Sequence, residues 1–264
     1  MLLNKKNLED YANKNEMPPS VKDILREFLQ VQILDSLSQS KYSDSISFLG
    51  GTALRLGHNV KRFSEDLDFD LVKKKGFSII ELEKVIKKDL QSQGFAVDSK
   101  VKTTENIHII YWKFSEVLQA MGFFVHKDEK LLIKFEIDFD PQKAIETEAI
   151  YVNKFDLNFP VLFNTISTIY SQKIIAIMFR PYQKGRDFYD LFWFITQKNL
   201  EPNYKLLQEK GIKVKNRAEL VVVIKDRLKK INLDQAVIDV KRFLFDPREA
   251  DWIKDLPKYL NSAH

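Results

Sequence analysis

The sequence predicts an α/β fold, in which a mixed sheet with helices is followed by a bundle of helices. Three observations predict it. Residues 66–72 alternate between acidic and apolar side chains, which is typical of a half-buried strand. Strand-like and helical segments are interleaved up to about residue 164. Beyond that residue the apolar side chains recur only with helical spacing. We therefore predict two domains, 1–164 and 165–264.

The spacing of apolar residues predicts the elements of the first domain in order. A helix is expected from Val21 to Leu37, after a polar leader that ends at Pro18-Pro19, and a second over 78–92, which Gly94 ends. Strands are expected at 46–49, 66–72, 95–102, 107–114, 130–139 and about 155–163. Pro160 lacks a backbone N–H, so we expect the last strand to lie at the sheet edge.

The second domain is expected to be helical throughout. Its predicted helices lie at about 167–179, 187–197, 203–210, 216–230, 233–245 and 249–260.

Composition excludes several classes of protein. With 44% hydrophobic and 30% charged residues in 264, the chain is an ordinary globular one rather than disordered, collagenous or coiled-coil. The absence of Cys excludes disulfides, thiolate catalysis and Cys-ligated zinc, and the four His show no ligand-like spacing. No apolar run approaches the ~20 residues of a membrane span, and no signal peptide is visible. We expect a cytoplasmic protein.

The net charge of +5 is unevenly distributed. Between Lys205 and Lys230 there are nine basic and three acidic residues, a local excess of 9 − 3 = 6 positive charges. Such a surface can follow a phosphate backbone. A solvated helix face is the alternative, and charge alone favours that alternative.

A glycine-rich turn follows the short strand at 46–49. Gly50-Gly51-Thr52 stands where a helix through Leu54 and Leu56 is expected to begin. Glycine lets backbone amides approach an anion closely, and a helix N-terminus attracts negative charge. An ordinary tight turn explains the same residues, so this motif alone does not decide.

Two strands carry acidic faces. Asp66 and Asp68 project from one face of the strand at 66–72, and Glu136, Asp138 and Asp140 project from one face of another. Carboxylates so arranged are typical ligands of Mg²⁺. If the two strands are neighbours, their charges repel unless a cation lies between them. A purely structural role would require the strands to be far apart.

Basic residues follow on the first helix of the second domain. Lys173 and Arg180 lie about two turns apart, so both side chains can point the same way. Lys173 could pair with carboxylates or bind a triphosphate. For Arg186 and Asp190 an ion pair within one helix is the simpler interpretation.

Three blocks of the sequence together resemble the AbiEii/AbiGii toxin family of nucleotidyltransferases, which includes the MenA-type toxins. The blocks are FLGGTALRLGHNVKRFSEDLDFDL at 48–71, LLIKFEIDF at 131–139 and SQKIIAIMFRPYQKGRDFYDL at 171–191. The first and third are specific to the family. The resemblance implies a polymerase-β-like nucleotidyltransferase core with an appended helical bundle, and transfer of a nucleoside monophosphate from an NTP to an acceptor hydroxyl.

The resemblance also implies roles for individual residues. Asp66 and Asp68 would hold two metal ions, Mg²⁺ or Mn²⁺, with Glu136 as the third carboxylate and Asp138 as the alternative. Lys173 and Asp187 match the family's functional Lys and Asp, and Lys173 would also contact the nucleotide. The other nucleotide-binding residues would be Gly50, Gly51, Thr52, Arg62 and Ser64.

Partners follow from the resemblance too. In some relatives the acceptor is the 3′ end of tRNA, so RNA and a cognate antitoxin are expected partners, and a toxin–antitoxin system is the expected setting. The alternative is a nucleotide- or RNA-binding module with the same fold and no significant turnover. The complete set of carboxylates, Asp66, Asp68 and Glu136, favours the enzyme.

Overall fold

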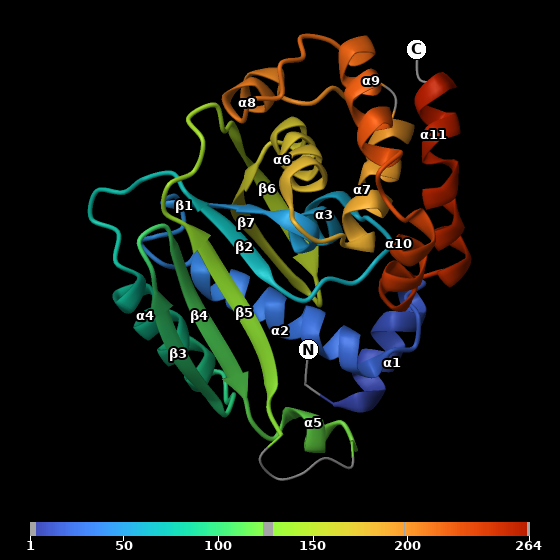
Figure 1. The fold of residues 1–264 in the computed structure, drawn as a ribbon. Helices are drawn as coiled ribbons and strands as arrows, with labels where there is room; N and C mark the ends of the chain where they lie inside the picture. Colours follow the sequence, from blue (N-terminus) through green and yellow to red (C-terminus); the bar gives the residue numbers. More distant parts are fainter. Residues whose placement is uncertain (1–3, 124–128, 198, 263–264) are drawn as a thin grey trace. The chain divides into compact units, whose positions relative to one another are not determined.

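The structure, a computed structural model, describes residues 4–123, 129–197 and 199–262. Contacts within the chain divide it into two compact units (Figure 1). The first unit consists of Met1–Asn59, Phe63–Pro141 and Glu148–Phe163, and the second of Val60–Arg62, Gln142–Thr147 and Asn164–His264. The predicted boundary at residue 164 stays a prediction, because contacts do not show which parts fold independently.

The first unit is built on a seven-stranded sheet with the order β3-β4-β5-β2-β1-β7-β6. Strand β2 is antiparallel to β1 and parallel to β5, so the sheet is mixed, as predicted. The strands are β1 (Ile46–Leu49), β2 (Leu67–Leu71), β3 (Val97–Thr103), β4 (Ile107–Phe114), β5 (Leu131–Asp138), β6 (Thr147–Lys154) and β7 (Leu157–Asn164).

The core of this unit lies between the sheet and two helices. Helix α2 contacts both α4 and β5, and α4 contacts β3, so the two helices pack on one face of the sheet. The rings of Phe48, Phe69 and Phe135 stack across β1, β2 and β5, with centroids 5.0 and 4.3 Å apart. The helices are α1 (Lys5–Lys14), α2 (Val21–Ser38), α3 (Gly50–His58), α4 (Ile79–Ser92) and α5 (Val117–Ala120).

Strand β7 differs from its prediction. It lies between β1 and β6, so the expectation of an edge strand is wrong. Pro160 is exposed, and the pairing of β7 with the short strand β1 is at Phe163, three residues further along. Pro160 therefore lies outside the segment of β7 that pairs with β1, so its missing N–H removes no hydrogen bond between these two strands.

The second unit is a group of helices around α7 (Gly185–Thr196). Most side chains of α7 are buried, and the helix contacts α6, α10 and α11. The other elements are α6 (Ile166–Phe179), α8 (Tyr204–Glu209), α9 (Arg217–Leu228), α10 (Leu233–Val240), the 3₁₀ helices Lys241–Phe243 and Pro247–Asp251, and α11 (Trp252–Ser262). Among the helices that the structure describes, none combines the length and apolar character needed to cross a bilayer.

One predicted helix of this unit ends early. The helix expected over 233–245 stops at Val240. Leu244 is extended and forms an isolated β-bridge with Arg62, and the amide of Phe245 donates to the carbonyl of Lys61. The chain leaves the helix because its backbone pairs with a segment from far upstream.

Candidate active site

The two acidic strands are hydrogen-bonded neighbours. Asp68 of β2 and Glu136 of β5 are Cα partners in a parallel pair, so both side chains project from one face of the sheet. The next pair on this face, two residues further along, is Asp70 with Asp138. The condition set for a shared cation site, that the strands are neighbours, is therefore met, and the distant strands that a purely structural role would require are not observed. Both Asp68 and Glu136 are partly exposed.

Asp66 stands just before β2, and the first turn of α3 holds it. The hydroxyl of Thr52 donates to the backbone carbonyl of Asp66. Thr52 is only 1% exposed. Its side chain therefore fixes the segment that leads into β2, instead of pointing to solvent as a phosphate ligand would. Two residues before Asp66, the backbone carbonyl of Ser64 accepts a hydrogen bond from the side-chain amide of Gln30.

The glycine turn lies against Asp68. Gly50 has φ +80°, and a Cβ placed there would lie 2.6 Å from Oδ2 of Asp68. Only glycine allows this approach. The residue before it, Leu49, is the N-cap of α3 and provides no side-chain cap. The amide end of a nine-residue helix, which attracts anions, is thus next to the acidic pair.

Lys134 lies among these carboxylates. Its ammonium forms an ion pair with Glu136, two residues further along β5. Burial by itself lowers the pKa of Lys134, but hydrogen bonding to Glu136 and the charges of Glu136, Asp66 and Asp68 outweigh burial and raise it. The acidic cluster therefore contains a positive charge that belongs to the chain.

The donor atoms of this cluster suit a hard divalent cation. Mg²⁺ prefers carboxylate oxygens, and Gly50 has no side chain to fill the space beside Asp68. Within the described residues, however, no group of three or more His, Cys, Asp or Glu side chains is arranged to hold a metal ion. The residue types suit a divalent metal, but in this structure the carboxylate of Glu136 is paired with the ammonium of Lys134.

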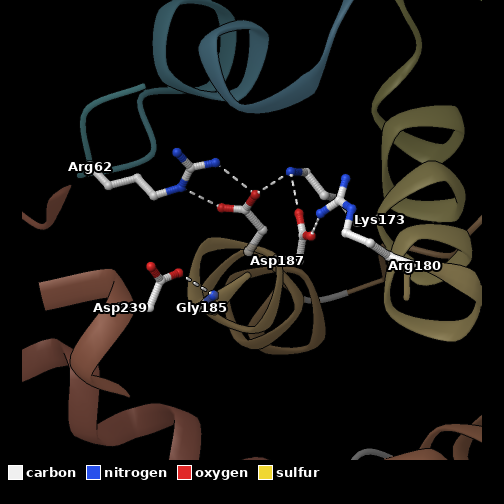
Figure 2. A network of polar contacts seen from close by, with 7 residues as sticks. Arg62, Lys173, Arg180, Gly185, Asp187 and Asp239 are labelled. Atoms are coloured by element: carbon white, nitrogen blue, oxygen red, sulfur yellow. Dashed lines mark hydrogen bonds and ion pairs between the residues drawn. The ribbon is translucent and has the colours of Figure 1, made fainter. Parts of the chain in front are cut away.

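A second cluster of charges is buried within the helical unit (Figure 2). Lys173 of α6 lies 3.0 Å from Oδ1 of Asp187 and 2.8 Å from Oδ2 of Asp190. Arg180, at the end of α6, also pairs with Asp187. Arg62 binds Asp190 through two hydrogen bonds of 2.6 and 2.7 Å. The expectation that Lys173 and Arg180 point the same way is confirmed.

Charge pairing holds this second cluster ionised. Burial alone lowers the pKa of Lys173, but the charges of Asp190 and Asp187 raise it above the ordinary value. For Asp190, burial raises the pKa, and the charges of Arg62 and Lys173 lower it further than burial raises it. The network therefore keeps Lys173 protonated and its position fixed by two carboxylates.

Asp190 does not stand on a solvated helix face, as a simple surface ion pair with Arg186 would require. Asp190 is fully buried with Arg62 and Lys173, while the guanidinium of Arg186 lies over the ring of Phe243, 4.1 Å from its centroid. Helical spacing permits the expected pair. One partner of Asp190, Arg62, is 128 residues away in sequence, and no local pattern indicates this pair.

The candidate residues fall into two groups. Eight lie in the first unit: Gly50, Gly51, Thr52, Ser64, Asp66, Asp68, Glu136 and the alternative Asp138. Arg62, Lys173 and Asp187 lie in the second unit. The sequence analysis assigned no role at the site to Lys134, and to Asp190 only an ion pair within its helix. For Lys134 a signal was present, since it lies two positions before Glu136 on one strand, and alternate residues of a strand share a face.

Comparison with known proteins agrees with this fold. The family model described as Nucleotidyl transferase AbiEii toxin, Type IV TA system, matches residues 32–262. The crystal structure of JHP933 from Helicobacter pylori is 22% identical, covers 92% of this chain and 91% of that chain, and has a TM-score of 0.59. A second H. pylori structure, provisionally described as a nucleotidyltransferase, is 22% identical over 91% and 94% of the two chains, with a TM-score of 0.59. These likenesses show the fold. No curated protein matches the chain.

Proposed function

The chain belongs to the AbiEii family of nucleotidyl transferase toxins of type IV toxin–antitoxin systems, and on that basis we propose that it transfers a nucleoside monophosphate from an NTP to an acceptor hydroxyl with a divalent metal. The observation that carries this proposal is the pairing of Asp68 with Glu136 beside the glycine turn at Gly50. Carboxylates and helix amides placed together suit a metal-bound triphosphate.

In this proposal Asp66, Asp68 and Glu136 hold Mg²⁺ or Mn²⁺. The register supports Glu136 over Asp138 as the third carboxylate, because Glu136 pairs with Asp68 while Asp138 pairs with Asp70. Asp138 also accepts a hydrogen bond from the amide of Asp140. When bound, the metal supplies activation of the acceptor oxygen and stabilisation of the leaving pyrophosphate.

The chain's own residues bind and orient the triphosphate. The backbone amides of Gly50 and Gly51 bind its phosphates at the start of α3, and Ser64 contributes from the following loop. Thr52 acts indirectly, because its hydroxyl holds the backbone of Asp66. The glycine amides and Ser64 stabilise the negative charge that develops on the phosphoryl oxygens.

The second cluster supplies a fixed cation. Lys173 is the functional lysine of the proposal, and Asp187 and Asp190 hold it in place. We assign Arg62 to positioning, because its guanidinium is 1% exposed and doubly bonded to Asp190. This assignment replaces the direct nucleotide contact that the resemblance implies for Arg62.

The acceptor in this proposal is RNA, with the 3′ end of tRNA as the specific case. Exposed lysines of the stretch 205–230 support it, since they offer positive charge to a phosphate backbone. A cognate antitoxin is the expected protein partner in the cytoplasm. A binding module without turnover is the alternative, and the test below distinguishes it.

Labelling of RNA tests the proposal directly. Purified protein is incubated with Mg²⁺, each α-³²P-labelled NTP and total tRNA. We expect label in tRNA with the wild type, none with Asp68→Asn, and wild-type labelling with Asp98→Asn, an exposed carboxylate on the edge strand β3. Full transfer by a folded Asp68→Asn protein contradicts the proposal. Metal-dependent NTP binding without transfer to any acceptor favours the binding module.

A further inference from the structure

Lys134 occupies a defined place beside the proposed metal ligands. It precedes Glu136 by two residues on β5, so the two side chains share a face, and they form an ion pair. The register pairs Leu67 with Phe135 and Asp68 with Glu136. Extending it by one residue puts Lys134 opposite Asp66. The ammonium thus lies within the set of carboxylates proposed to bind the metal.

Three carboxylates in one place repel one another unless a cation balances them. The charges of Asp66, Asp68 and Glu136 all act on Lys134. Its side chain is 32% exposed and that of Glu136 is 28% exposed, so neither is locked inside the core. A long, flexible lysine side chain can leave such a position when a stronger cation arrives.

We propose that Lys134 takes the cation position at Glu136 in the metal-free protein and competes with the divalent metal for that carboxylate. This inference rests on the proposed function. Metal alone then binds weakly, because it must displace the ammonium from Glu136. A metal that arrives with an NTP gains phosphate oxygens as further ligands, so loading of the metal is coupled to loading of the nucleotide.

Titration of the purified, full-length protein with Mn²⁺ in the absence of nucleotide tests the competition. Free Mn²⁺ is measured by electron paramagnetic resonance. We expect Lys134→Met and Lys134→Gln to bind Mn²⁺ about fivefold more tightly than the wild type, which is the factor that one exposed ion pair can contribute. The matched control is Lys100→Met. Lys100 is exposed and lies in the same row of the sheet, two strands away through Tyr111.

A double-mutant cycle separates direct competition from a general change of charge. If Lys134 acts through Glu136, the gain from Lys134→Met shrinks to that of Lys100→Met when both are made in a Glu136→Gln background. A gain of undiminished size in that background overturns the inference, because the effect then does not require the ion pair.

The remaining outcomes distinguish the inference from the proposed function. Equal or weaker Mn²⁺ binding by folded Lys134 variants, with binding lost in Asp68→Asn, overturns the inference and leaves the metal site standing. If no variant binds Mn²⁺, even with an NTP present, the metal-dependent function itself fails, and the inference fails with it. Circular dichroism of each variant establishes that it is folded.

Discussion

Arg62 and Asp190 form a buried, doubly hydrogen-bonded ion pair between residues that are 128 positions apart in sequence. The guanidinium is 1% exposed and the carboxylate 0% exposed. The same carboxylate also binds Lys173, so the position of Asp190 helps to fix the lysine that is proposed to act in the reaction. Arg62 and Lys173 thus share the negative charge of Asp190.

Removing Asp190 is expected to destabilise the protein strongly. In Asp190→Leu, Arg62 loses its paired carboxylate and Lys173 keeps only Asp187, so we expect a loss of about 3–5 kcal/mol in the free energy of unfolding. The double variant Arg62→Met, Asp190→Leu removes both charges and is expected to be more stable than Asp190→Leu alone. Urea unfolding measures both. A double variant less stable than the single one contradicts this account.

Gly185 is expected to tolerate no side chain. A Cβ there would lie 2.1 Å from the carbonyl oxygen of Ala236, which is backbone and cannot turn aside. We expect Gly185→Ala to lower the free energy of unfolding by about 2 kcal/mol or more. Gly211→Ala is the control: it meets no atom within 4 Å and loses only about 1 kcal/mol for its positive φ. Equal losses in thermal or urea unfolding would show that the close approach to Ala236 is unimportant.

His58 is expected to make stability depend on pH. Burial lowers its pKa below the ordinary value of 6.5, although the charge of Glu148 acts in the opposite direction. The unfolded chain therefore binds a proton more readily than the folded one, and the free energy of unfolding falls as pH drops through about 6.5. We expect His58→Gln to show a shallower fall between pH 7.5 and 5.5 in urea unfolding. Identical slopes for the two proteins would contradict the prediction.

The lysine-rich stretch is expected to carry RNA binding. Lys210, Lys213 and Lys215 are exposed, and replacing all three with Gln should weaken tRNA binding. The slope of log K against log salt concentration should become shallower by roughly 2 to 3, since each phosphate contact contributes about 0.7 to 0.9. The control replaces Lys74, Lys75 and Lys88, which are equally exposed in the first unit. Filter binding at several salt concentrations measures the tRNA affinity of both triple variants. Equal weakening by the two sets would show that the lysine-rich stretch is not a specific RNA-binding surface.

Much of the sheet could be predicted because its residues alternate. The strands that became β2, β4 and β5 were each found within one or two residues, and the mixed α/β class is confirmed. Strand β6 was missed because it lies at the sheet edge and most of its side chains are exposed, so its pattern is weak. The hairpin turn after it is made by Phe155 and Asp156, both with positive φ, where glycine or asparagine usually gives the signal.

The N-terminal segment shows a similar limit. Helix α1 lies in what reads as a polar leader, because its only buried side chains are Leu8 and Ala12. Two apolar positions one turn apart are too few for a periodic pattern. The helix is fixed by tertiary packing, including a stacked pair of rings from Tyr11 and Phe155 with centroids 4.0 Å apart.

The candidate site was predictable where its residues are close in sequence. The Asp66 and Asp68 pattern and the strand carrying Glu136 could both be read from alternation, and the register between them is what the structure adds. The role of Asp190 was not predicted because its partner Arg62 is 128 residues away in sequence. Lys134 was assigned no role although its spacing from Glu136 on one strand is visible in the sequence. The metal, the acceptor and the assignment of individual site residues stay predictions.

The three-residue segment Val60–Arg62 belongs to the helical unit although it comes from within the first part of the chain. Lys61 accepts a backbone hydrogen bond from Phe245, and Arg62 neutralises Asp190. A polypeptide that starts at residue 164 therefore lacks both this backbone pairing and the counter-charge for a buried carboxylate. The helical unit is therefore not one uninterrupted stretch of the sequence, and a fragment cut at the 164 boundary omits part of it.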